Sequence, residues 1–95
     1  MKLWLDDIRP APAGYKWVHS VNGAKQSIVA CEKRGEPVEL LDLDHDLGDY
    51  AHRGGDAIKL IYWLIERNTL YKIRLHTMNP VGRQNMQSMI ERYWT

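Results

Sequence analysis

The 95-residue sequence contains no phenylalanine, one cysteine and four prolines, and it has no long apolar segment. Because Cys31 is the single cysteine, the chain can form no internal disulfide and shows no zinc-finger spacing. The longest unbroken apolar run covers residues 60–65, which is far too short to cross a bilayer. The first residues show no basic segment followed by an apolar one, so we expect no signal peptide and a cytoplasmic location.

An excess of charge of one sign is also missing. Thirteen Lys and Arg residues against twelve Asp and Glu residues give a formal net charge of +1. This balance gives no reason to expect duplex nucleic acid or a membrane surface as a partner. The hydrophobic share of 44% and the charged share of 26% are ordinary globular values. We therefore expect a single folded domain over residues 1–95.

The order of apolar segments and turn residues predicts strands that alternate with helices. Strands are expected at residues 3–5, 15–19, 38–43 and 72–76, and helices at about 20–34, 56–67 and from 80 onward. Ser20 or Asn22 can cap the first helix, and Gly35 can end it. Asn79 followed by Pro80 can start the last helix. The alternation is typical of an α/β fold with an open, mostly parallel sheet and right-handed crossovers.

The apolar residues also predict which surfaces are buried. The nearly continuous apolarity of residues 38–43 predicts a strand covered on both faces. The expected core face is Ile58, Ile61, Tyr62 and Ile65 in the second helix, and Met86, Met89, Ile90, Tyr93 and Trp94 in the last. Leu60, Trp63 and Leu64 widen the face of the second helix so far that we expect part of it to meet another subunit.

Polar residues follow the carboxyl ends of three predicted strands. They are Asp6 and Asp7 after the first strand, Asp44, His45 and Asp46 after the third, and His76, Thr77 and Asn79 after the fourth. In an open α/β sheet, ligands bind in the crevice outside the carboxyl ends of the strands. The sequence therefore predicts a functional site at this edge, although no single motif in it is specific.

The aspartates at this edge predict a cation. Two or three carboxylates gathered at one place repel each other unless something neutralises them. We expect Mg²⁺ or Mn²⁺, held by Asp6, Asp7 and Asp44 together with waters and a substrate phosphate, and no organic cofactor. Taken singly, each aspartate is better explained as a turn residue, so the metal hypothesis depends on the whole set.

The histidines are candidates for acid–base chemistry. His45 and His76 can act as general base or acid near neutral pH, and paired histidines can also bind Zn²⁺, Mn²⁺ or Fe. If the third strand continues through Asp46, this residue and His45 point to opposite sides, whereas an earlier turn allows them to meet. His76 is equally well explained as a strand-end residue that hydrogen-bonds to a loop.

The start of the last helix predicts an anion site. Free backbone N–H groups and the helix dipole favour a phosphate there. An arginine in the first turn opposes the dipole, and a contact with phosphate would give Arg83 a reason to be there. The other candidates for phosphate or substrate binding are Asn79, Asn85, Thr77 and Arg9, and Arg53 could add to the same pocket.

Three segments carry a resemblance to a known family. LWLDDIRP, LDLDHDLGD and RLHTMNPVGRQNM together resemble the cyclic-phosphate-processing receiver domains, which are small relatives of the response-regulator receivers. The resemblance spans essentially the whole chain. It implies a flavodoxin-like sheet with four strands in the order 2-1-3-4 and three helices, and hydrolysis of cyclic phosphates on nucleotides or RNA ends. The family positions it implies are Asp6, Asp7, Asp44, His45, Asp46, His76, Asn79, Arg83 and Asn85.

The sequence also departs from ordinary receivers. Only residues 9–14 are available for the helix between the first two strands, and the 95 residues include no fifth strand with the lysine that contacts a phosphoryl group. The missing lysine weighs against two-component phosphotransfer. Asp42 leaves two choices for the position of the receiver phospho-acceptor, of which Asp44 is preferred because it follows the strand. An open fourth strand beside a wide apolar helix suggests a homodimer.

Three functions remain open at this stage. The first is a metal-dependent phosphoesterase that acts on a phosphate-bearing small molecule or an RNA end, with His45 and His76 as interchangeable base and acid. The second is a signalling or binding module that holds phosphate without turnover. The third is a domain that serves only protein–protein contact through its apolar helix faces.

Overall fold

Four short strands form one parallel sheet in the computed structural model, which describes residues 1–94. They are β1 (Lys2–Leu5), β2 (Tyr15–Val18), β3 (Leu40–Leu43) and β4 (Ile73–Leu75), in the spatial order β2-β1-β3-β4. This order and the parallel pairing confirm the predicted α/β fold.

The three predicted helices are present. They are α1 (Val21–Lys33), α2 (Ile58–Arg67) and α3 (Pro80–Tyr93), and a short 3₁₀ helix, η1 (Gly48–His52), was not predicted. Ser20 rather than Asn22 caps α1, and its Oγ accepts a hydrogen bond from the Gly23 N–H at 3.0 Å. Asn79 caps α3 in the same way, and Pro80 takes the first helical position as expected.

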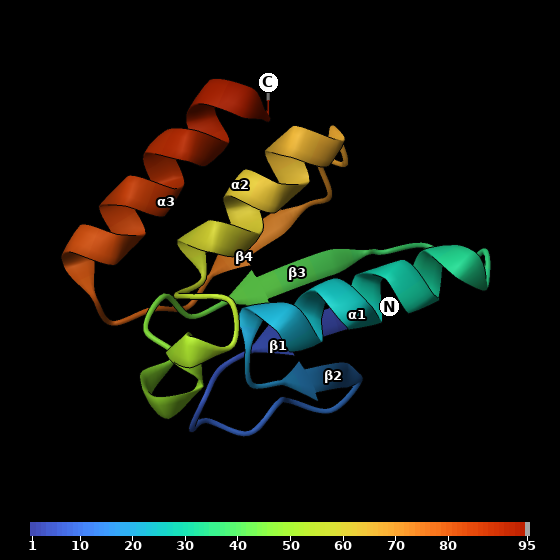
Figure 1. Cartoon of the computed structure of the whole chain (residues 1–95), viewed down its shortest axis with the longest axis horizontal. Coiled ribbons are helices and arrows are strands. Elements are labelled where there is room, and N and C mark those ends of the chain that lie inside the picture. The colour runs from blue at the N-terminus through green and yellow to red at the C-terminus, as the bar shows by residue number, and fades with distance from the viewer. Residues whose placement is uncertain (95) are drawn as a thin grey trace.

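The core lies between the sheet and the helices. Figure 1 shows α1 and α2 over one face of the sheet, with α3 alongside α2. The strand residues that point to this face are fully buried: Leu3, Leu5, Leu41 and Leu43. Alternate residues of each strand point the other way, so the same geometry places Trp4 of β1, Asp42 of β3 and Arg74 of β4 side by side on the opposite face.

The opposite face of β3 differs from the prediction. Residues 38–43 were expected to be covered by apolar packing on both faces, but this face of β3 carries the buried Asp42. Its carboxylate contacts His76, whose ring stacks on Trp4. A small polar cluster therefore covers this strand where apolar packing was expected.

The predicted helix faces need two corrections. Tyr62 and Tyr93, expected in the core, are 39% and 38% exposed, whereas Leu60 and Leu64 are fully buried within this chain. The apolar face of α2 is thus rotated toward the chain's own core, so Leu60 and Leu64 are not available to another subunit. The homodimer stays a prediction that sedimentation analysis would test.

The sequence predicted no segment that crosses a membrane, and the helices can be compared with this prediction. In the part of the chain that the structure describes, no helix has the length and apolarity needed to cross a bilayer.

Candidate functional site

Backbone hydrogen bonds extend the sheet beyond its strands and align the polar residues at its carboxyl edge. The Asp6 N–H donates to Val18 O at 3.1 Å, Asp44 N–H donates to Leu5 O at 2.9 Å, and His76 N–H donates to Leu43 O at 3.0 Å. These bonds place Asp6, Asp44 and His76 in one row. The predicted convergence of the three strand ends is present for this physical reason.

Asp6 is a buried carboxylate with all of its acceptor positions in use. Oδ1 accepts from the backbone N–H groups of Ile8 and Arg9 at 2.9 and 2.8 Å. Oδ2 lies 3.1 Å from Arg9 Nε and 3.0 Å from His76 Nε2. Burial raises the pKa of Asp6, but the two backbone hydrogen bonds, His76 and the charge of Arg9 outweigh it, so the pKa is lowered overall. Asp6 is thus held as an anion that fixes the loop after β1.

His76 has both ring nitrogens against carboxylates. Nδ1 lies 2.6 Å from Asp42 Oδ1, and Nε2 lies 3.0 Å from Asp6 Oδ2. The ring also stacks on Trp4, with centroids 3.8 Å apart and planes only 4° from parallel. With no nitrogen left for a substrate in this arrangement, the ring is placed to position Asp6.

Asp7 and Asp44 are the more open carboxylates of the predicted metal group. Asp6, Asp7 and Asp44 each offer an oxygen, and these oxygens lie within 4.8 Å of one another. Burial, followed by the neighbouring charges of Asp6, Asp44 and Asp46, raises the pKa of Asp7. Arg9 relieves only part of this repulsion, since its Nη2 lies 3.6 Å from Asp44 Oδ2. Clustered oxygen donors with unrelieved negative charge fit a hard divalent cation.

Gly48 makes room for Asp7. Its φ of +53° lies in the left-handed region, and a Cβ there would lie 2.5 Å from Asp7 Oδ2. A larger residue at position 48 would therefore collide with a candidate metal ligand.

His45 and Asp46 meet, because β3 ends at Leu43 and the chain turns before it reaches them. His45 Nδ1 lies 2.8 Å from Asp46 Oδ1, and Asn79 Nδ2 donates to both oxygens of Asp46 at 3.1 Å. The hydrogen bond from His45, assisted by that from Asn79, lowers the pKa of Asp46 against the effect of burial. Among residues 1–94, the other ring nitrogen of His45, Nε2, has no hydrogen-bond partner.

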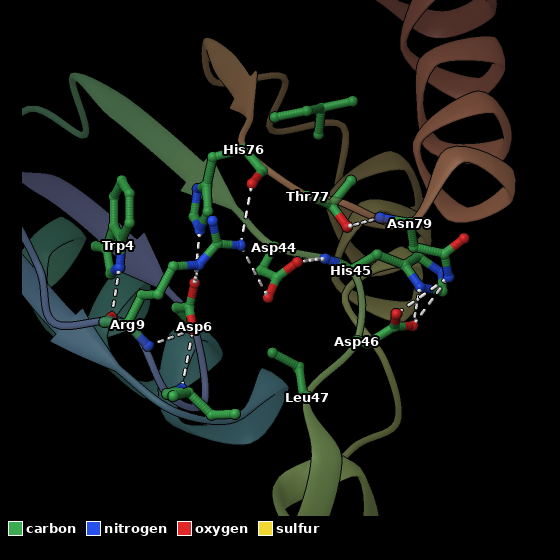
Figure 2. Close-up of polar contacts among 12 residues, drawn as sticks. Trp4, Asp6, Arg9, Asp44, His45, Asp46, Leu47, His76, Thr77 and Asn79 are labelled. Atoms are coloured by element: carbon green, nitrogen blue, oxygen red, sulfur yellow. Dashed lines mark hydrogen bonds and ion pairs between the residues drawn. The ribbon is translucent and has the colours of Figure 1, made fainter.

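Figure 2 shows that these contacts form two groups that meet at Asp44. One group joins Asp6, Arg9 and His76, and the other joins His45, Asp46 and Asn79. Asp44 bridges them, since Arg9 lies beside one of its oxygens while its Oδ1 accepts from the His45 N–H at 2.8 Å. Asp44 thus touches the second group through the His45 backbone N–H, while the His45 ring itself lies with Asp46.

The start of α3 differs from the predicted phosphate pocket. The Gly82 N–H donates to Asn79 Oδ1, so the cap uses one of the N–H groups that were expected to be free, while the Arg83 N–H makes the first bond within the helix, to Asn79 O. The Asn79 side chain also brings the negative charge of Asp46 to this helix end. A Cβ at Gly82 would lie 2.4–2.8 Å from atoms of the His45 ring, so the helix end packs directly on that ring.

The remaining phosphate candidates have different surroundings. Thr77 is buried, and its Oγ1 accepts from the Asn79 N–H at 3.1 Å. Arg83 is exposed and holds Leu75 O with one nitrogen at 3.2 Å. Asn85 is exposed and makes no side-chain hydrogen bond within the described chain, so neither group of contacts includes it. Asp42, the alternative phospho-acceptor, lies within β3. Asp44 follows the strand and is the acid that groups with Asp6 and Asp7.

The family follows from a comparison with known protein families. The model of the cyclic-phosphate processing receiver domain matches residues 1–92. This chain belongs to that family. No curated protein and no solved structure matched this receiver domain.

Sequence reasoning missed two residues that shape the site of this receiver domain. Trp4 was not among the predicted site residues, and Asp42 was predicted only as an alternative phospho-acceptor, yet together they fix the ring of His76. Side chains alternate between the two faces of a strand, so residues 4, 42 and 76 share one face once the strand register is known. This alternation is the sequence signal that could have found them.

A second cluster of possible ligands adjoins the first. His45, Asp46 and Asp56 offer donor atoms within 4.8 Å of one another. Asp56 Oδ1 accepts from the Leu47 N–H at 3.1 Å and so holds the turn after β3. The receiver domain thus uses this carboxylate to shape the segment that carries His45.

Proposed function

We propose that this receiver domain is a metal-dependent phosphoesterase that opens the cyclic phosphates of nucleotides or RNA ends. The observation that carries the proposal is the oriented imidazole beside the acidic group. Asp46 holds His45 Nδ1, Nε2 is unbonded in the described chain, and the Asp44 carboxylate lies next to it in the chain.

His45 serves as the general base. When Nδ1 carries its proton toward Asp46, Nε2 has a free electron pair that accepts a proton from water. The water oxygen then forms a bond to phosphorus as one ring P–O bond breaks. The imidazolium returns the proton to the oxygen that leaves, so the product is a phosphomonoester with one new hydroxyl group. Asp46 stabilises the charged ring, and Asn79 orients Asp46.

Asp7 and Asp44 are the residues that would hold Mg²⁺ or Mn²⁺, with Asp6 as the anchor behind them. The ion supplies positive charge where negative charge develops on the phosphate oxygens. Electrostatics supports this ion. Without it, an anionic phosphate would meet four carboxylates, those of Asp6, Asp7, Asp44 and Asp46, and Arg9 is the cation paired to this group.

Arg9 and Arg83 are the phosphate-binding candidates that the geometry supports best. Both side chains are exposed. Arg83 donates to Leu75 O, whereas Arg9 donates to His76 O and also pairs with Asp6 and Asp44. A guanidinium group matches two phosphate oxygens at once. Thr77 and Asn79 are not expected to contact the phosphate directly, because their side chains hold the turn that leads into α3.

The first test measures ring opening by phosphorus NMR. The intact chain is incubated with nucleoside 2′,3′-cyclic phosphates or 3′,5′-cyclic phosphates and with Mg²⁺, Mn²⁺ or EDTA. We expect a phosphomonoester signal that needs the metal and that falls about 10²–10⁴-fold in His45→Gln. His52→Gln, which changes an exposed histidine in η1, is the matched control. Equal rates for the His45→Gln variant and the native chain would refute this role.

The alternative is a module that binds phosphate without turnover. It is favoured by the position of Asp44 beside Asp6 and Asp7 at the end of β3. Incubation with acetyl phosphate and Mg²⁺, followed by intact-mass measurement, separates the two functions. A stable phosphoryl adduct that disappears in Asp44→Asn would favour the module.

A further inference from the structure

A second feature of the molecule is a pocket beside the acidic site. It has a volume of about 260 Å³ and lies where the end of β2, the first turns of α1 and the loop of η1 meet. Its lining includes three rings and one guanidinium group, namely Trp17, His19, Tyr50 and Arg53. This volume lies just below the range of about 300–1,000 Å³ that is usual for drug-sized ligands, so the pocket suits a single small ring system.

The three rings form a continuous row. The centroids of Trp17 and His19 are 4.6 Å apart, and those of His19 and Tyr50 are 5.1 Å apart with planes 25° from parallel. Trp17 and Tyr50 are 37% and 36% exposed, so part of each ring is open to solvent. Aromatic faces that are exposed in a row are suited to stacking on a flat ligand.

The row of three rings lies next to the Asp6–Asp7 segment because strand pairing and a hydrogen bond place it there. β2 pairs with β1 in parallel, so Val18 lies opposite Leu5, and His19 follows β2 as Asp6 follows β1. The indole N–H of Trp17 donates to Asp6 O at 2.8 Å. On the other side, Tyr50 belongs to η1, whose first residue, Gly48, touches Asp7. A ligand in the pocket therefore lies next to the Asp6–Asp7 segment.

We infer that this pocket binds the nucleobase of the substrate, so the preferred substrate class is a cyclic mononucleotide or the terminal nucleotide of an RNA. This inference deepens the proposed function and rests on it for the reaction. Stacking on the exposed part of the Trp17 or Tyr50 ring tolerates any base, because every base has an aromatic face. The side chains of Gln26 and Ser27 on α1 line the same pocket and offer polar groups to the edge of a base.

The test compares a nucleotide with a ligand that lacks the base. Uridine or adenosine 2′,3′-cyclic phosphate is compared with glycerol 1,2-cyclic phosphate, in the wild-type chain and in Tyr50→Ala. We expect KM for the nucleotides to rise about tenfold in Tyr50→Ala, while KM for the glycerol compound stays unchanged. Tyr62→Ala is the matched control, because Tyr62 is 39% exposed on α2 and Tyr50 is 36% exposed on η1.

A binding measurement keeps the pocket separate from the reaction. The indole N–H signal of Trp17, assigned with Trp17→Phe, is followed by NMR during titration with each compound. We expect a saturable shift with the nucleotides and none with glycerol 1,2-cyclic phosphate. Hydrolysis of both compounds with equal KM changes in Tyr50→Ala, or nucleotide binding that leaves the Trp17 signal unmoved, would overturn the pocket. An absence of hydrolysis with a saturable Trp17 shift would overturn the proposed reaction and support the pocket, and an absence of both would overturn the two together.

Discussion

Single contacts at the edge of the sheet set the chemistry of individual side chains. His45 and His76 are both histidines at strand ends, but their surroundings differ. One nitrogen of His45 is held by Asp46, whereas both nitrogens of His76 face carboxylates. The same residue type thus keeps one ring nitrogen unbonded within the described chain at His45, as the proposed base requires, while His76 is placed to position Asp6. Gly82 has a similar local importance, since the His45 ring occupies the space of its missing side chain.

Gly82→Ala tests the position of the His45 ring. Alanine favours a helix over glycine by about 1 kcal/mol, so the change alone would stabilise α3. The new Cβ would lie 2.4–2.8 Å from the ring of His45, so the ring must move. We expect a loss of activity of tenfold or more with little change in Tm, measured by phosphorus NMR and calorimetry. Ser88→Ala on the same helix is the control, and full activity of Gly82→Ala would contradict the packing argument.

At the scale of elements, α1 and the C-terminal end of α2 are joined by a charged contact. Arg67 Nη2 donates to Glu32 Oε1 at 2.7 Å, and Tyr71 donates its hydroxyl hydrogen to Glu32 Oε2. The hydrogen bond from Arg67, followed by that from Tyr71, lowers the pKa of Glu32, and burial opposes them. Because α1 follows β2 and α2 precedes β4, this contact holds the two crossovers of the sheet together.

Glu32→Gln tests this contact through its pH dependence. A carboxyl group with a lowered pKa in the folded state stabilises the fold above its ordinary pKa of 4.5, and the gain is lost as the pH falls through the lowered folded value. We expect Glu32→Gln to cost about 1 kcal/mol at pH 7, or a fall in Tm of about 4–8 °C. Below pH 4 the difference from the native chain should shrink, as urea denaturation at the two pH values would show. A constant difference at both pH values would exclude the ionic contribution.

For the whole molecule, the acidic edge stores electrostatic repulsion in the folded state. Burial and the charges of Asp6, Asp44 and Asp46 raise the pKa of Asp7, which means that the folded chain disfavours the ionised form. An ion that binds only the folded state stabilises it by mass action, by about 2.7 kcal/mol at 100 times its Kd. The site is thus expected to be less stable than its surroundings until a cation is bound.

Asp7→Asn tests whether the charge of Asp7 destabilises the metal-free fold and binds the cation. Removing the charge should raise the metal-free Tm by a few degrees at pH 7, because a raised folded pKa means that ionisation opposes folding above it. The same variant should lose most of the increase in Tm that Mg²⁺ or Mn²⁺ gives the native chain. Asp49→Asn, which changes an exposed acid in η1, is the control for general charge effects. A metal-dependent increase that survives in Asp7→Asn would assign the ion to other ligands.

The order of the elements and the edge where the site lies could be predicted from local sequence patterns. Apolar runs, Ser20, Asn79 and Pro80 act over a few neighbouring residues, so the strands, caps and helices could be predicted from local chemistry. The parallel sheet then required the strand ends that carry Asp6 and Asp44 to meet.

The contacts of each polar side chain at this edge depend on the three-dimensional arrangement of distant segments. His76 meets partners that are 34 and 70 residues away in the chain, so its role depends on strand register and on the ring of Trp4. The early end of β3 likewise decided that His45 and Asp46 meet. Hydrogen bonds require distances within a few tenths of an ångström, and no spacing along a sequence fixes such distances between separate segments.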